Sequence, residues 1–249
     1  TDAMYALAVL YLNSHYGEEN RASGVTLLTQ AAEAEHSDSA MFLAHLYYSG
    51  DMVDRDLAKA RSYYVQAAEL DNAFAQRSYA RFLLDRSADQ TSDPRVFAWL
   101  GKLADDDDPE AMLLLGNLHA RGVGTRQNYR RAVSWYKGAV KLSPENATIV
   151  NEVAWTLTVS DQDGLQRTRY ARNIMDTLME ANQEARKRPE YLDTWAASYA
   201  ATGNFPRAIE LQEEALTVAE EMNFDDVLEI LREHLDAFHD QQIIIEAAP

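Results

Sequence analysis

Residues that can recognise a ligand recur along one side of a series of predicted helices. They combine guanidinium groups, amides, an imidazole, and aromatic or thioether surface: Tyr5, Met41, His45, Tyr48, Arg77, Arg81, Asn117, Arg121, Asn151 and Trp155. Guanidinium groups match carboxylates bidentately, asparagine amides can satisfy a peptide backbone, and aromatic residues and Met supply apolar contact area. The set predicts a binding surface for a protein or peptide segment with acidic and apolar residues.

The basic residues in this set have an alternative explanation, in which they pair within the helix or face solvent and bind no ligand. Arg81 and Asp85 are four residues apart and can pair on one helix face, with Arg77 as a solvated cation. The charge balance favours binding instead. The chain has a net charge of −17, yet Arg77, Arg81 and Arg121 are opposed on this stripe by Asp85 alone.

Two acidic stretches resemble parts of metal sites. Asp105–Asp108 is a run of four carboxylates, but calcium needs six or more oxygens from a looped backbone, and this run leads into a predicted helix. Asp161–Gly164 resembles part of a calcium loop without its third acidic ligand or terminal Glu. Both are interpreted as turns, with one Asp of the first run capping a helix. No metal site is predicted.

Catalytic signatures are also absent from the sequence. It contains no GxSxG, no HExxH and no phosphate-binding glycine loop, and its histidines are never at ligand spacing on one helix face; His234 and His239 are five apart. We therefore predict no catalytic residues, no enzyme activity and no cofactor.

The elements that would position these residues repeat at a fixed period. Leu7, Leu43, Tyr79 and Leu115 are 36 residues apart, and a small residue follows each of them. A second landmark recurs at Ala31, Ala67, Leu103 and Ala139. Self-similarity at a period of this size predicts a solenoid.

The best-preserved copy runs from Ala111 to Leu142. Its first half places apolar residues at three- and four-residue steps, and Gly122 and Gly124 then end the helix. A second amphipathic run follows, with Trp135 and Tyr136 on its packing face, while Gly116 lets the two backbones approach. Each copy is thus a helical hairpin that must pack on its neighbours.

These residues resemble the Sel1-like repeat, a subfamily of the tetratricopeptide repeats. The match is best over Ala111–Val140 and nearly as close over Ser39–Leu70. Two copies depart from the pattern: Gly24 stands where Ala is usual, and Arg86-Ser-Ala88 replaces the glycine loop. The resemblance implies a protein-interaction scaffold, often bacterial and often in the cell envelope, and a concave wall lined by the first helices.

The chain divides by repeat type. Residues 1–142 are predicted to form four Sel1-like repeats, 143–223 two tetratricopeptide-like repeats, and 224–249 a capping helix and a tail containing Ile243–Ile245. The expected fold is all-α: a right-handed α-α superhelix of about six helical hairpins, or twelve helices, plus the cap, with almost no strand.

Composition limits the partners. A net charge of −17 argues against nucleic acid and anionic membranes, and no apolar run approaches the length of a membrane helix. The absence of cysteine excludes disulfides and leaves periplasm, cell envelope and cytoplasm open. Because the chain starts at Thr1 inside a predicted helix, we expect upstream sequence, with any targeting signal, to be missing.

The predicted function is a non-catalytic adaptor that holds a protein or peptide segment in its concave groove. The alternative is a hydrolase or carbohydrate-binding protein acting on cell-wall or exopolysaccharide substrates. A hydrolase should show titratable groups converging in one pocket, whereas an adaptor should show an open groove.

Overall fold

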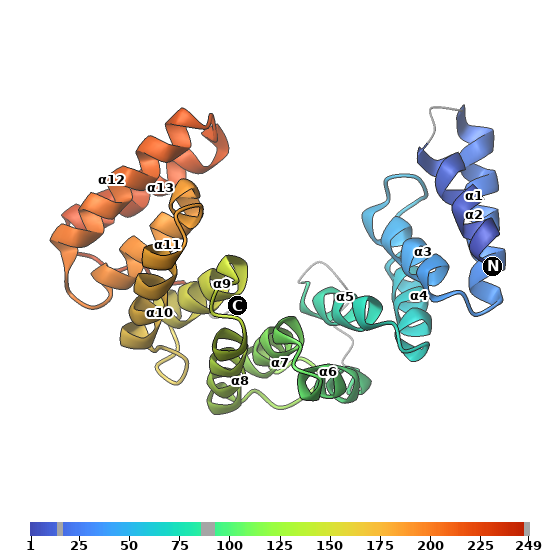
Figure 1. The fold of residues 1–249 in the computed structure, drawn as a ribbon, viewed down its shortest axis with the longest axis horizontal. Helices are drawn as coiled ribbons and strands as arrows, with labels where there is room; N and C mark the ends of the chain where they lie inside the picture. Colours follow the sequence, from blue (N-terminus) through green and yellow to red (C-terminus); the bar gives the residue numbers. More distant parts are fainter. Residues whose placement is uncertain (14–16, 86–92, 247–249) are drawn as a thin grey trace. The chain divides into compact units, whose positions relative to one another are not determined.

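The computed structural model describes residues 1–249 except 14–16, 86–92 and 247–249. It shows two compact units, the first made of residues 1–106 with 123–125 and the second of residues 107–122 with 126–249. In both units consecutive helices form hairpins (Figure 1). Arg86-Ser-Ala88, expected to replace the glycine loop, lies outside the described residues.

The first unit consists of three helix pairs. Its helices are α1 (Asp2–Asn13), α2 (Gly17–Glu33), α3 (Ser37–Ser49), α4 (Leu57–Glu69), α5 (Ala73–Leu84) and α6 (Arg95–Asp105). The small landmark residues Ala8, Ala44 and Ala80 are fully buried, which allows the helices to approach closely. Gly24 is explained in the same way, because a Cβ there would lie 2.9 Å from Cγ of Leu12.

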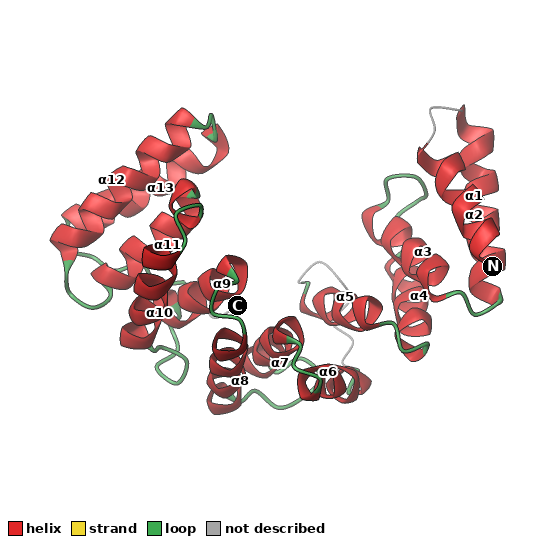
Figure 2. Cartoon of the chain, viewed as in Figure 1, coloured by secondary structure: helices red, strands yellow, loops and turns green. Residues whose placement is uncertain are grey.

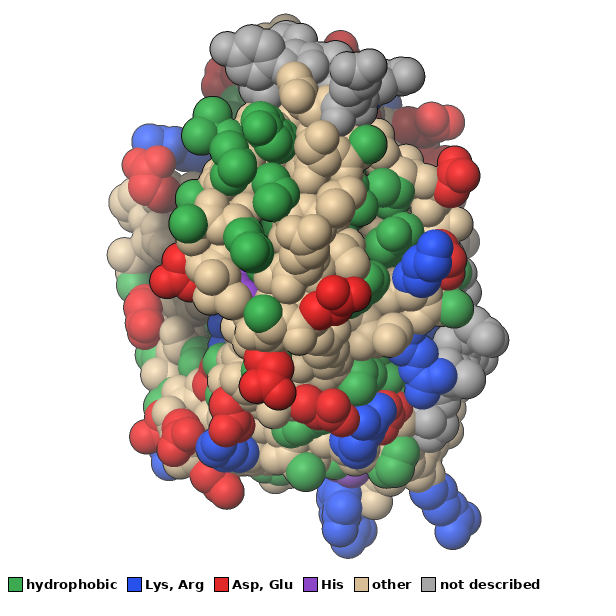
Figure 3. Space-filling model, turned by 90° about the vertical axis from the view of Figure 1, so that its right-hand side faces the viewer, with side chains coloured by type: hydrophobic (Ala, Val, Ile, Leu, Met, Phe, Trp, Pro, Cys, Tyr) green, Lys and Arg blue, Asp and Glu red, His purple; other side chains and the backbone are tan. Residues whose placement is uncertain are grey.

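One landmark of the first unit is not in the expected environment. Leu43 and Tyr79 are fully buried, but Leu7 is 41% exposed. Helices α3 and α5 pack against α2 and α4, which precede them, whereas none of the described helices precedes α1. Met4 and Leu10 of α1 are exposed as well. Figure 3, a view onto the side that carries α1 and α2, shows hydrophobic side chains gathered there.

The second unit has three further helix pairs and a final helix. They are α7 (Pro109–Arg121), α8 (Tyr129–Leu142), α9 (Ala147–Val159), α10 (Thr168–Ala181), α11 (Pro189–Ala200), α12 (Phe205–Glu221) and α13 (Asp225–His239), with a 3-10 turn, η1 (Ala185–Lys187), before α11. One continuous apolar cluster extends from α7 to α13. In α13, Leu231 and Phe238 are buried against it, as expected for the capping helix.

Local sequence explains where these helices begin and end. Asp56, Asp108 and Asn128 each accept a backbone N–H bond in the first turn of the following helix. Gly50 and Gly122 adopt positive φ at the ends of α3 and α7. The carboxylate run therefore contains a helix cap, and among the described residues no group of three His, Asp or Glu side chains could hold a metal ion.

The all-α solenoid predicted from the sequence is confirmed. The described residues contain thirteen α-helices, matching twelve repeat helices and a cap, and no strand beyond an isolated bridge between Ser160 and Glu246 (Figure 2). Within this part of the chain, no helix is both long enough and apolar enough to cross a membrane. The assignment of repeat types to residues 1–142, 143–223 and 224–249 stays a prediction.

A buried ionic cluster stabilises the joint between α5 and α6. Asp93 is 4% exposed and accepts hydrogen bonds from Tyr79 Oη (2.8 Å), Arg95 Nε (3.0 Å) and Arg95 Nη2 (2.7 Å). Arg61 Nε donates to Tyr79 Oη at 3.2 Å. The bonds from Arg95, with the one from Tyr79, lower the pKa of Asp93 to about 2, against the opposing effect of burial.

We expect Asp93→Asn to lower the free energy of unfolding at neutral pH by about 2 kcal/mol. Because the folded pKa is lowered, the stabilisation by Asp93 is complete above its usual pKa and is lost as the pH falls towards about 2. The difference between the two proteins in urea titrations should therefore be markedly smaller at about pH 2.5 than at about pH 7. An equal difference at both pH values would mean that the charge of Asp93 contributes nothing.

Candidate functional site

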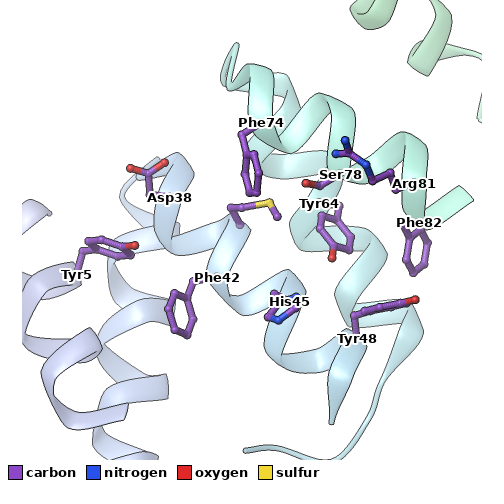
Figure 4. A pocket seen from close by; sticks show the side chains of 11 residues that line it. Tyr5, Asp38, Phe42, His45, Tyr48, Tyr64, Phe74, Ser78, Arg81 and Phe82 are labelled. Atoms are coloured by element: carbon purple, nitrogen blue, oxygen red, sulfur yellow. The ribbon is translucent and has the colours of Figure 1, made fainter. Parts of the chain in front are cut away.

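The first unit contains an aromatic cavity of about 610 Å³. Its lining comes from α1, α3, α4 and α5: Tyr5, Asp38, Met41, Phe42, His45, Tyr48, Tyr64, Phe74, Ser78, Arg81 and Phe82. Figure 4 shows these side chains directed into a common space between the helices. The volume lies within the range typical of ligand pockets, which are mostly apolar with a few placed polar groups.

Helix α3 supplies the floor of the cavity. Asp38, Met41, His45 and Tyr48 follow one another at steps of three or four residues, so they share one face of the helix. The opposite face carries the fully buried core residues Ala40 and Leu43, which anchor α3 in the unit. The orientation of the lining residues is therefore fixed by burial of the other side of the helix.

Helix α5 supplies one wall by the same periodicity. Phe74, Ser78, Arg81 and Phe82 recur at helical spacing on the side that faces α3. Phe74 is 57% exposed, a large apolar side chain at the rim, while Phe82 is buried and packs edge-on against Tyr48 at 5.9 Å between ring centroids. The exposed ring of Phe74 extends the apolar lining of the cavity to the protein surface.

Charged groups lie at the two ends of the cavity. Asp38 lies on the side of Tyr5, whereas Arg81 lies beside Ser78, on the side of Phe82 (Figure 4). The Tyr48 hydroxyl donates to the Asp85 carboxylate, and Arg55 Nε donates to the Tyr48 carbonyl at 3.1 Å. A ligand would therefore meet a cation at one end, an anion at the other, and aromatic surface between them.

Tyr64 contributes a neutral aromatic ring to the cavity. It is 5% exposed, and burial, with a smaller effect from Tyr48, raises its pKa to about 12. The phenol therefore stays neutral over the physiological range. It can bond a ligand as a neutral donor or acceptor but is not a base.

The cavity brings together five of the ten residues predicted to bind a ligand. They are Tyr5, Met41, His45, Tyr48 and Arg81. Arg77 lies one turn before Arg81 on α5 and does not belong to the lining. The sequence did not single out Phe42, Tyr64, Phe74 or Phe82 as binding residues, although Phe42 lies one turn before His45 and Phe74 two turns before Arg81.

The other four predicted residues are in the second unit, and hydrogen bonds hold Asn117 and Trp155 there. The Asn117 amide donates to Glu152 Oε1 at 2.9 Å and accepts from the Tyr136 hydroxyl at 2.8 Å. Trp155 Nε1 donates to Glu246 Oε2 at 3.0 Å. Asn151 lies on α9, and Arg121 ends α7.

Comparison with known proteins identifies the repeats. The Sel1 repeat model matches residues 1–36, 37–72 and 109–143. The chain thus carries Sel1 repeats, and the resemblance inferred from the sequence is confirmed for these three segments. Among curated proteins, none is similar enough in sequence to count as a match.

Two solved structures of bacterial proteins are similar to this chain in fold. A Sel1 repeat protein from Oxalobacter formigenes is similar with a TM-score of 0.53 at 20% identity, covering 84% of each chain. The protective antigen c5321 of uropathogenic Escherichia coli, which displays an SLR fold, has a TM-score of 0.60 at 18% identity over 96% of this chain. This chain spans 52% of the length of c5321. At these identities the similarity shows the fold alone.

Sel1 repeat proteins generally mediate protein–protein interactions and are generally non-catalytic.

Proposed function

We propose that the chain is a non-catalytic scaffold and that the aromatic cavity of its first unit binds a partner segment with apolar and acidic residues. The observation that carries the proposal is the convergence of five predicted binding residues with exposed Phe74 around one cavity. Aromatic rings and Met41 supply apolar contact area, which carries most of the affinity in protein interfaces.

The charges orient the expected segment. We expect an acidic side chain of the partner to pair with the Arg81 guanidinium, because a guanidinium and a carboxylate form charge-assisted hydrogen bonds. Asp38, at the other end, repels an acid and accepts a donor. The expected segment therefore has an apolar centre with its acidic residue on one side.

A hydrolase acting on cell-wall polysaccharide is a weaker candidate. Glycosidases generally use two carboxyl groups that flank the scissile bond. Among the described residues that line the cavity, Asp38 is the only carboxylate. A location in the bacterial envelope stays a prediction drawn from the resemblance.

Selection of a displayed library of random peptides on the full chain tests the proposal. We expect enriched peptides to combine an aromatic or aliphatic residue with an acid, and Arg81→Ala to weaken their binding about tenfold. Phe74→Ala should weaken it similarly with little loss of stability, since the side chain is already exposed.

Arg77→Ala is the matched control, since it removes the same charge from the same helix outside the cavity lining. It should leave affinity within about twofold. Equal effects of Arg77→Ala and Arg81→Ala, or binding of cell-wall oligosaccharides in place of peptides, would contradict the assignment.

A further inference from the structure

The segment after the capping helix folds back onto the second unit. Helix α13 is closed by a bond from Gln242 N–H to Ala237 C=O (2.8 Å), with Gln241 at positive φ. Residues 242–245 belong to no helix or strand, and Glu246 forms an isolated bridge. We call residues 242–246 the C-terminal segment.

The C-terminal segment ends in a one-residue parallel strand pairing with the end of α9. Glu246 N–H donates to Val159 C=O at 2.7 Å, and Asp161 N–H donates to Glu246 C=O at 3.0 Å. The Glu246 carboxylate accepts from Trp155 Nε1 at 3.0 Å. The backbone after α9 thus presents one acceptor and one donor in strand geometry, beside a fixed indole donor.

Side chains of the C-terminal segment alternate as in a strand. Ile244 packs against the core of the second unit, and the Glu246 carboxylate points the same way. Ile243 and Ile245 point outward and are 42% and 48% exposed. The second unit therefore contacts an aliphatic side chain at one position of the segment and a carboxylate two positions later.

The Trp155 indole, which donates to the Glu246 carboxylate, packs against residues of the second unit. Trp155 packs against His234, with 5.8 Å between ring centroids, and His234 Nδ1 donates to Asp193 Oδ1 at 2.8 Å. His234 is itself buried, so it supports one face of the indole from within the second unit.

We propose that this region is a second peptide-binding site, which accepts an extended segment of a partner with an aliphatic residue two positions before a carboxylate. The C-terminal segment occupies the site within the same chain and resembles that ligand. Strand addition supplies backbone bonds that any sequence can make, and the Ile244 and Glu246 positions supply selectivity. An intramolecular occupant lowers the apparent affinity for the external segment in proportion to the fraction of time the site is filled.

Several features indicate that the intramolecular occupant can be displaced. Only one of its three isoleucines packs against the core. Within the described part of the chain, the bonds that join it to Trp155, Val159 and Asp161 all involve one residue, Glu246. A segment with so few contacts detaches from the unit at a low free-energy cost. A partner segment with equivalent groups can then take its place.

The test uses a fluorescent synthetic peptide with the sequence of residues 240–246 and the full-length chain. The double substitution Ile244→Ser with Glu246→Ala removes both side chains by which the C-terminal segment contacts the second unit, and we call it the displaced variant. This variant should bind the peptide at least tenfold more tightly than wild type in fluorescence anisotropy. Adding Trp155→Phe, which removes the indole donor, should weaken that binding at least fivefold.

The matched control is Ile243→Ser with Ile245→Ser, which changes the outward side chains of the same segment. It should bind the peptide as wild type does. The proposal is overturned if the displaced variant melts like wild type and binds the peptide no more tightly, or if the control gains as much affinity as the displaced variant.

Hydrogen exchange on the wild-type chain provides a test that needs no variant. Saturating unlabelled peptide should keep the Asp161 amide protected, because the peptide supplies a carbonyl in place of that of Glu246. The Glu246 amide should lose protection as its own segment leaves. Simultaneous protection of both amides at saturation would overturn the proposal.

Discussion

Asp193→Leu is expected to lower the free energy of unfolding by about 3–5 kcal/mol, because it leaves two buried polar groups without their acceptor. Asp193 Oδ1 accepts from His234 Nδ1 at 2.8 Å and from Gln212 Nε2 at 2.7 Å. All three residues are buried: Asp193 of α11 is 8% exposed, Gln212 of α12 is 0% exposed and His234 of α13 is 6% exposed. Urea titration of the wild type and the variant gives the difference directly.

This loss should depend on pH. Burial lowers the pKa of His234, but the hydrogen bond to Asp193 and the charges of Asp193, Glu246 and Glu233 raise it more, so the net shift is upward. A raised folded pKa gives stability that is complete below the unfolded pKa, near 6.5, and is lost as the pH rises through the folded value. The deficit of Asp193→Leu should therefore be larger at about pH 5.5 than at about pH 8.5.

Asp193→Asn separates charge from hydrogen bonding. The amide oxygen can still accept from both donors, so the loss should be nearer 1 kcal/mol and should depend less on pH. As a surface control, Glu210→Ala removes an ion pair with Arg207 whose side chains are 62% and 38% exposed, and should change stability by less than about 1 kcal/mol. A loss for Asp193→Leu as small as that of Glu210→Ala would mean that the buried cluster does not stabilise the unit.

Gly116→Leu is expected to destabilise the second unit by about 3 kcal/mol. A Cβ at Gly116 would lie 2.3 Å from Cε1 and 2.5 Å from Cδ1 of Tyr136. Tyr136 is fully buried, and its hydroxyl is bonded to Asn117, so the ring cannot move aside without losing that bond. The overpacking outweighs the gain in helix propensity that replacing glycine brings.

Gly101 provides the matched control for this prediction. It also lies inside a helix, α6, but no atom would come within 4 Å of an added Cβ. Gly101→Ala should therefore stabilise the protein by about 0.5–1 kcal/mol, whereas Gly116→Ala should destabilise it. If both alanine variants proved equally stable in thermal unfolding, the contact between Gly116 and Tyr136 would not be tight.

The sequence was sufficient to predict the helical hairpins and their joints. Helix periodicity, caps such as Asp108 and stops such as Gly122 act within a few residues, so they can be recognised locally. The close approach at Gly116 was predicted for the same reason, since the repeat aligns it with small residues in the other copies. The register of Tyr5, Met41 and Arg81 on first helices also followed from the repeat period.

The tertiary structure alone decided which of those residues share a site. The cavity needs Tyr64 from α4 and Phe74 from α5, whose approach depends on packing between neighbouring hairpins. The cluster of Asp193 and His234 joins residues 41 positions apart, and no spacing rule connects them. Trp155 was predicted to be available for a partner, yet it binds Glu246, because an extended segment outside the repeat pattern returns to α9. Helical faces follow from local periodicity, whereas contacts between hairpins and the paths of non-repetitive segments are set by packing over long sequence separations.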